Sequence, residues 1–161
     1  MKRNMTLTVN GRDHQLTVKT NHSLLEVLRE QLNLFSVREG CGVGMCGSCT
    51  VLVDGQALSA CLLLATQVEG KQLITTEGLA KNGSLHYVQQ AFVEATGFQC
   101  SYCTPGFILS TIALLDENPH ASKEEIREYL AGNLCRCGSY NKILDAVIRA
   151  QRRALNRGSE C

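Results

Sequence analysis

Eight of the nine cysteines in this 161-residue chain fall into two separate groups of four, and this grouping constrains the fold more than any other feature. The first group reads Cys41-x4-Cys46-x2-Cys49, with Cys61 after eleven intervening residues. The second reads Cys100-x2-Cys103 and, after a gap of thirty-one residues, Cys135-x-Cys137. The backbone must therefore converge on two sites, each rich in sulfur.

Cysteines in such numbers usually form disulfides or bind metal. The apolar run at residues 62–65 is too short for an export signal or a membrane span, and the N-terminus leads directly into an alternating strand pattern. We therefore expect a cytoplasmic protein without a membrane partner. Because a reducing compartment keeps thiols free, it favours metal ligation over disulfides.

The first group has the spacing of plant-type [2Fe–2S] ferredoxins, and its loop at residues 40–49 contains four glycines. Glycines allow the tight turns and positive φ angles that converging thiolates need, and they let backbone N–H groups approach the sulfurs. Structural zinc sites instead pair cysteines two to four residues apart in two knuckles. The spacing favours a [2Fe–2S] cluster over zinc or free thiols, with Cys61 as the fourth ligand.

The second group suits a cluster for an electrostatic reason. Cys100 and Cys103 precede one expected helix, and Cys135 and Cys137 precede another. Helix N-termini favour thiolates through their unpaired N–H groups and the positive end of the helix dipole. The spacing alone leaves zinc knuckles and two disulfides open, although Cys135-x-Cys137 is too tight for an ordinary knuckle.

The first half of the chain is typical of a small α+β domain of the ubiquitin-like or ferredoxin-like kind. Ser23 and Glu26 form a capping box that opens a helix to about residue 32. Alternating apolar residues and turn signals predict strands at residues 5–9, 15–18, 50–53 and 73–75, with turns at Asn10-Gly11 and Asp54-Gly55.

The second half predicts a four-helix bundle. Gly78, Asn82 and Gly83 mark a linker, so we place one domain at residues 1–77 and a helical domain at residues 78–161. Ser84 is the expected cap of the first helix and Gly97 its stop. The remaining helices are expected at residues 105–115, 122–130 and 140–155, and the apolar segment 107–115 should be the most buried.

Charge and motifs exclude several functions. The chain has 16 basic and 15 acidic residues, and its net charge of +1 argues against nucleic acid or an anionic membrane as a partner. The one local excess of charge is interpreted as a solvated helix face: Arg149, Arg152, Arg153 and Arg157.

The sequence contains no Ser-His-Asp order, phosphate loop or dinucleotide fingerprint, so we expect no catalytic residue in this chain. Surface or turn positions are expected for His14, His22, His86 and His120.

Three motifs carry a specific resemblance: Gly40-Cys41-Gly42-Val43-Gly44 with Cys46-Gly47-Ser48-Cys49, then Gln99-Cys100-Ser101-Tyr102-Cys103-Thr104-Pro105-Gly106, then Gly132-Asn133-Leu134-Cys135-Arg136-Cys137. Together they resemble the small iron–sulfur subunit of the xanthine dehydrogenase/molybdenum hydroxylase family. The resemblance implies a plant-type ferredoxin-like (β-grasp) domain followed by a four-helix [2Fe–2S] domain. It also makes the second group a cluster site.

The resemblance further implies an electron-transfer role in a multi-subunit oxidoreductase. In such enzymes a large subunit carries a molybdenum pterin that oxidises the substrate. Electrons pass singly through two [2Fe–2S] clusters, usually to FAD on a medium subunit. By this analogy the cluster at Cys100, Cys103, Cys135 and Cys137 lies nearer molybdenum, and the cluster at Cys41, Cys46, Cys49 and Cys61 lies nearer the flavin. Gln99 and Cys137 match positions that contact the pterin in relatives.

The chain departs from the family pattern at Gly138-Ser139, where relatives commonly read Thr-Gly, and at Ser101-Tyr102, where Gly-Phe is commoner. These departures leave open a flavin-free, two-subunit relative that reduces a cytochrome. A free-standing ferredoxin-type carrier and a zinc scaffold are further alternatives. Cys161 has no counterpart and is expected to be a free thiol. Exposed apolar surface is expected around residues 102–107 and 134–140, in contact with larger subunits.

Overall fold

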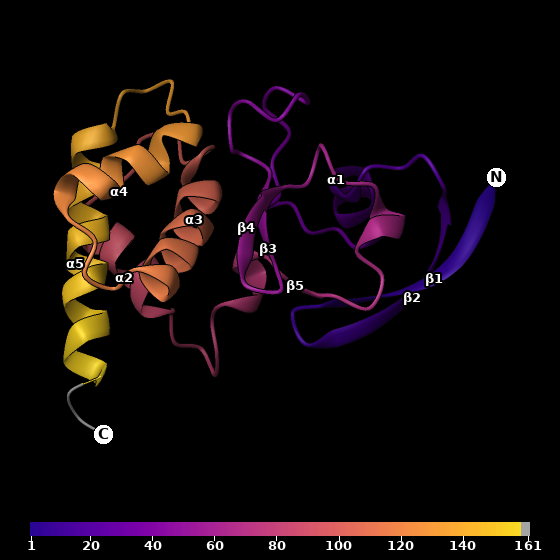
Figure 1. Cartoon of the computed structure of the whole chain (residues 1–161), viewed down its shortest axis with the longest axis horizontal. Coiled ribbons are helices and arrows are strands. Elements are labelled where there is room, and N and C mark those ends of the chain that lie inside the picture. The colour runs from indigo at the N-terminus through magenta and orange to yellow at the C-terminus, as the bar shows by residue number, and fades with distance from the viewer. Residues whose placement is uncertain (159–161) are drawn as a thin grey trace.

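A computed structural model describes residues 1–158, so Cys161 lies outside the described part of the chain. A five-stranded sheet is followed by a group of helices (Figure 1). The strands are β1 (Lys2–Val9), β2 (Arg12–Lys19), β3 (Thr50–Val53), β4 (Gln56–Ser59) and β5 (Gln72–Ile74). The α-helices are α1 (Leu24–Glu26), α2 (Tyr87–Glu94), α3 (Thr104–Glu117), α4 (Lys123–Tyr129) and α5 (Tyr140–Gly158). Short turns of other helix types are η1 (Val27–Gln31), η2 (Ala65–Gln67), η3 (Thr76–Gly78) and η4 (Leu130–Gly132).

The sheet has the strand order β2-β1-β5-β3-β4, in which β1 and β5 are parallel and the other neighbours are antiparallel. Both hairpins close through two-residue turns, Asn10-Gly11 and Asp54-Gly55, whose residues all have positive φ angles. Such turns match the right-handed twist of the strands that they join. The predicted α+β fold class is confirmed.

The first helix begins as predicted but does not continue as a regular α-helix. The Ser23 hydroxyl accepts the Glu26 N–H, and the Glu26 carboxylate accepts the Ser23 N–H at 2.7 Å, which completes the capping box. After Glu26 the chain widens into the π-helical turn η1, whose Val27 and Leu28 are fully buried. Capping signals predict where a helix begins, but they carry no information about this widening.

The cap of α2 was predicted incorrectly. Ser84 forms an isolated bridge with Lys81, and the helix begins at Tyr87 with His86 as its cap. The His86 N–H donates to Gln89 Oε1 at 3.0 Å, while His86 Nδ1 accepts the Val88 N–H at 3.4 Å. Gln89 supplies the return bond of a capping box three residues after His86, which explains why the helix begins there. His86 therefore has a structural role that the prediction did not include.

Helix α3 is the centre of the helical half, as predicted, with ten consecutive buried residues from Gly106 to Leu115. It packs against α2 and α5 on one side and against β3 and β4 on the other (Figure 1). All four residues of β3 are buried, because the strand has a hydrophobic core on each face. Val51 and Val53 belong to the core of the sheet half, and Leu52 belongs to the core around α3. The two halves are thus packed directly against each other.

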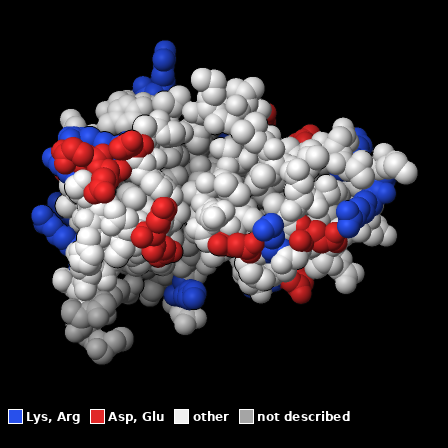
Figure 2. Space-filling model, in the orientation of Figure 1, with Lys and Arg blue, Asp and Glu red and all other residues white. Residues whose placement is uncertain are grey.

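Charged side chains of both signs lie interspersed on the face shown in Figure 2. Within the C-terminal basic cluster, Arg153 pairs with Glu94 at 2.6 Å and so connects α5 to α2. No helix within residues 1–158 is long and apolar enough to cross a membrane.

A polar network connects the segment after β5 to the rest of the sheet half. Thr75 N–H donates to Asn10 Oδ1 at 2.9 Å, and Glu77 accepts hydrogen bonds from the Ser36 N–H at 2.8 Å, the Ser36 hydroxyl and the Thr75 hydroxyl. Desolvation alone would raise the pKa of Glu77. The hydrogen bonds from Ser36 and Thr75 outweigh it, so this pKa lies below its ordinary value of 4.5.

We expect Glu77→Gln to lower the apparent Tm at neutral pH and to have a smaller effect in acid. The pKa of Glu77 is lower in the folded chain than in the unfolded chain. Its stabilisation is therefore present above the unfolded pKa and is lost as pH falls through the folded pKa. Thermal unfolding of the full chain at about pH 7 and about pH 4 tests this, with Glu128→Gln on exposed α4 as the control. An equal loss of Tm at both pH values contradicts the prediction.

Candidate metal centres

The first cysteine group lies at one end of the β3–β4 hairpin. Cys49 directly precedes β3, and Cys61 follows β4 after one residue. The Ala60 N–H donates to the Cys49 carbonyl at 3.2 Å and continues the hairpin pairing, which brings Cys49 and Cys61 together. Cys41 and Cys46 reach the same place from the glycine-rich loop. All four are free thiols, and Cys41 is exposed whereas Cys49 is buried.

The thiols of this group interact in pairs. Cys41 interacts with Cys46, and Cys49 interacts with Cys61. The charge of Cys46 also contributes to raising the pKa of Cys49. The N–H groups of Val43 and Met45 donate to Cys41 Sγ at 3.4 and 3.3 Å and lower the pKa of Cys41 to about 7. Burial raises the pKa of Cys49 to about 11. Burial thus disfavours the thiolate form of Cys49, and a bound cation would compensate its charge.

The loop that carries these cysteines requires glycine at specific positions, as predicted. Gly44 has φ +77°, and a Cβ there would overlap Leu62 Cδ1. Gly47 has φ +66°, and a Cβ there would overlap the Asn133 side chain and lie 2.7 Å from Gly132 O. A Cβ on Gly40 would lie 2.7 Å from Cys46 Sγ. The absent side chains leave room for the sulfur atoms and for the helical half.

The second group lies at the N-terminal ends of α3 and α5, as predicted. Cys103 is the N-cap residue of α3, and Cys135 and Cys137 precede α5. Its thiols also interact in pairs, Cys100 with Cys137 and Cys103 with Cys135. The Tyr102 N–H and the Cys137 thiol lower the pKa of Cys100. Burial and the neighbouring Cys135 raise the pKa of Cys103 to about 12.

Cys135 is held by the start of α5. Burial alone would raise the pKa of Cys135, but the Ser139 N–H, which donates to Cys135 Sγ at 3.5 Å, contributes to a net lowering. The Cys135 N–H donates to the Tyr140 hydroxyl at 2.9 Å.

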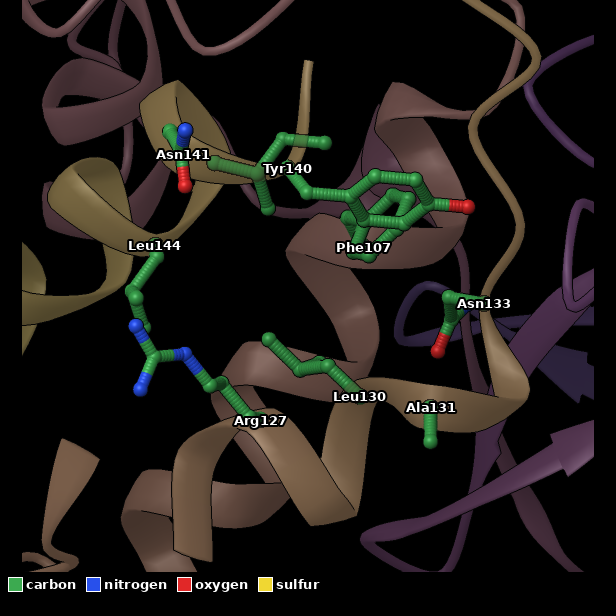
Figure 3. A pocket seen from close by; sticks show the side chains of 9 residues that line it. Phe107, Arg127, Leu130, Ala131, Asn133, Tyr140, Asn141 and Leu144 are labelled. Carbon is green, nitrogen blue, oxygen red and sulfur yellow. The ribbon is translucent and has the colours of Figure 1, made fainter. Parts of the chain in front are cut away.

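The Tyr140 ring meets Phe107 edge to face, with ring centroids 6.4 Å apart, and both residues line a pocket of about 360 Å³ (Figure 3). Of the apolar surface predicted here, Tyr102, Leu134 and Tyr140 are exposed, whereas Phe107 is buried.

Each group of thiols fits a two-iron core. The thiols of each group interact in two pairs, and a [2Fe–2S] core takes four thiolates, two on each iron. Together with the N–H donors to sulfur and the glycine cradle, this donor set suits an iron–sulfur cluster at both groups.

The predicted pterin-contact residues lie side by side. Gln99 Nε2 donates to the Cys137 carbonyl at 3.4 Å, and Gln99 is exposed whereas Cys137 is partly exposed. Their contact with a pterin stays a prediction.

Three hydrogen bonds connect the second group directly to the loop of the first. The Leu134 N–H donates to the Cys46 carbonyl at 2.9 Å, and Asn133 Nδ2 donates to the Gly47 carbonyl at 3.2 Å. The Tyr102 hydroxyl donates to the Glu39 carbonyl at 2.5 Å. These contacts were not predicted from the sequence. All three donors lie within two residues of a cysteine of the second group, and this was the available signal.

Two protein-family signatures match the chain. A 2Fe-2S iron-sulfur cluster binding domain matches residues 7–80, and a [2Fe-2S] binding domain matches residues 75–148. The xanthine dehydrogenase iron-sulfur-binding subunit of Escherichia coli O157:H7 is 49% identical over 148 residues, which cover 90% of this chain and 92% of that protein. The chain belongs to the small iron–sulfur subunits of the molybdenum hydroxylases. The predicted pair of [2Fe–2S] cofactors and the electron-transfer class are thereby confirmed.

Solved structures agree with this assignment of the iron–sulfur subunit. Quinoline 2-oxidoreductase from Pseudomonas putida 86 matches with a TM-score of 0.92 and 39% identity, over 98% of both chains. The aldehyde oxidoreductase from Desulfovibrio desulfuricans ATCC 27774 matches with a TM-score of 0.89 and 44% identity. That match covers 96% of this chain but only 17% of the longer aldehyde oxidoreductase chain.

We expect Gly47→Ala to damage the first centre much more than Gly55→Ala does. Both glycines have positive φ angles, so an alanine costs about 1–2 kcal/mol of backbone strain at either position. At Gly47 the new Cβ would also push the loop away from Asn133 and Gly132, whereas at Gly55 nothing lies within 4 Å. Iron content, thermal stability and the two EPR signals test this. Equal behaviour of the two variants contradicts a requirement for close approach at Gly47.

Proposed function

We propose that this subunit conducts electrons from a molybdenum pterin on a large partner subunit to FAD on a medium subunit or to another acceptor. The observation that carries the proposal is the hydrogen bond from the Leu134 N–H to the Cys46 carbonyl. It joins a cysteine of the first group to the residue that directly precedes Cys135 of the second. A carrier with two independent centres has no need of such a connection.

The proposal assigns one [2Fe–2S] cluster to each cysteine group. Each cluster, when bound, takes up and releases one electron. The ligands would be Cys41, Cys46, Cys49 and Cys61 for the first and Cys100, Cys103, Cys135 and Cys137 for the second. We place the boundary between the two binding domains at residues 77–78, which is supported by the end of β5 at Ile74 and the start of α2 at Tyr87.

The residues between the two groups provide a short connection. From Cys46 the path follows its carbonyl, one hydrogen bond to Leu134 and one peptide bond to Cys135. Asn133 is only 6% exposed, and its amide holds the adjacent Gly47 carbonyl. The two hydrogen bonds hold the cysteine groups next to each other.

The exposed corners of the two groups are the proposed ends of the path. We assign the molybdenum pterin subunit to the corner with Cys100, Gln99 and Cys137, supported by the exposed apolar side chains of Leu134 and Tyr140 nearby. We assign the acceptor to the corner at Cys41, where Val43, Met45 and Leu62 are exposed. Apolar side chains gathered on a surface commonly mark a protein contact.

A cytoplasmic location belongs to the same proposal. All eight cysteines within the described residues are free thiols, as suits a reducing compartment.

The first test is EPR of the dithionite-reduced complex, which consists of this chain and the subunits that co-purify with it. Metal and flavin analysis of the same sample accompanies the EPR. We expect two distinct [2Fe–2S] signals, about four irons per copy of this chain and molybdenum in a larger partner. A single signal, or zinc in place of iron, contradicts the assignment of the second group. Flavin in a medium-sized partner distinguishes the FAD-linked enzyme from a flavin-free relative.

Single ligand substitutions should remove one signal each. Cys137→Ala should abolish the signal of the second cluster and leave that of the first. Cys61→Ala is the matched counterpart and should do the reverse, because each thiol belongs to one group alone. EPR and iron analysis of the purified complexes measure this. Loss of both signals in both variants contradicts two separate ligand sets.

A further inference from the structure

The hydroxyl of Ser139 is buried beside the second cysteine group without an assigned role. Ser139 is only 4% exposed and directly precedes α5, and its carbonyl accepts the Ile143 N–H at 2.9 Å. A serine in this position commonly uses its side chain to cap the helix. Here the hydroxyl oxygen is buried and has no hydrogen-bond partner within residues 1–158. Buried hydroxyl groups nearly always have a partner, so one is missing at this place.

The backbone directs Ser139 toward Cys135. The Ser139 N–H donates to Cys135 Sγ at 3.5 Å. The Ser139 side chain lies near enough to contribute to the lowering of the Cys135 pKa, but its hydroxyl does not meet hydrogen-bond geometry with that sulfur. Gly138 has φ +74°, a conformation that brings the chain back toward Cys135 and that suits glycine.

We propose that the Ser139 hydroxyl donates a hydrogen bond to the Cys135 thiolate when the second cluster is bound, and that this bond raises the reduction potential of that cluster. The inference rests on the proposed role of Cys135 as a ligand. Reduction adds one electron and no proton, so negative charge on the sulfurs increases. A donor to sulfur therefore stabilises the reduced form more than the oxidised form.

The functional consequence concerns the distribution of electrons within the subunit. A higher potential at the second cluster holds the electron nearer the proposed pterin end, at the expense of the first cluster. Ser139 is in this sense a positioning residue for charge rather than a catalytic residue.

The test is a redox titration of the purified complex followed by EPR, which reads the two clusters separately. Ser139→Ala removes the hydroxyl, and Ser139→Thr retains it as the matched control. We expect the ratio of reduced to oxidised second cluster at a fixed potential to fall about threefold in Ser139→Ala, which equals roughly 30 mV for one electron. Ser139→Thr should keep the wild-type ratio. The first cluster should titrate unchanged in both variants.

Ser139→Gly provides a second removal variant, because glycine has no side chain and therefore also lacks the hydroxyl. Unchanged titrations of the second cluster in Ser139→Ala and Ser139→Gly, with both signals present, overturn the inference and leave the proposed function intact. Absence of the second signal from the wild-type complex overturns the proposed function itself.

A measurement on the wild-type complex covers the case in which both variants lose the second cluster. After exchange into D2O, pulsed EPR should detect coupled deuterons from both the amide and the hydroxyl of Ser139. Detection of the amide deuteron alone overturns the inference.

Discussion

Direct backbone contact between the first cysteine loop and the helical half is the constraint on which the rest of the structure depends. A Cβ on Gly106 would overlap the Gly47 carbonyl, and a Cβ on Gly47 would lie 2.7 Å from the Gly132 carbonyl. With no side chains in between, main-chain atoms near Cys46 meet main-chain atoms near Cys135. Two redox centres on separate sequence segments thereby become neighbours. The glycines are required on both sides of this contact, because a methyl group on either would separate the loops.

Each cysteine group combines an exposed thiol whose pKa is lowered with a buried thiol whose pKa is raised. In the first group these are Cys41 and Cys49, and in the second Cys100 and Cys103. N–H donors lower the pKa of the exposed thiol and favour its anion, whereas burial disfavours the anion of the other thiol unless bound iron compensates its charge. Cluster binding and folding of the surrounding loops are therefore linked, since the apolar surroundings of the buried thiol tolerate its charge only with the metal in place.

Features encoded by neighbouring residues could be predicted from the sequence. The Asn10-Gly11 turn, the Ser23 capping box and the buried α3 helix each depend on residues a few positions apart, and all were confirmed. The α2 cap was missed because His86 and Ser84 are both compatible with a start in that region, and only Gln89 decides between them. Within the sites, the spacing identified the two cysteine groups. The Asn133–Gly47 hydrogen bond joins residues 86 positions apart, so no local pattern could reveal it.

Strand β3 has a further consequence, because its alternate side chains complete two different hydrophobic cores. Because the halves share this strand, a rotation of one half against the other would disturb the packing of both cores at once. The tunnelling distance between the two centres is then a constant of the fold. The interior of the subunit serves as a rigid spacer between the two centres.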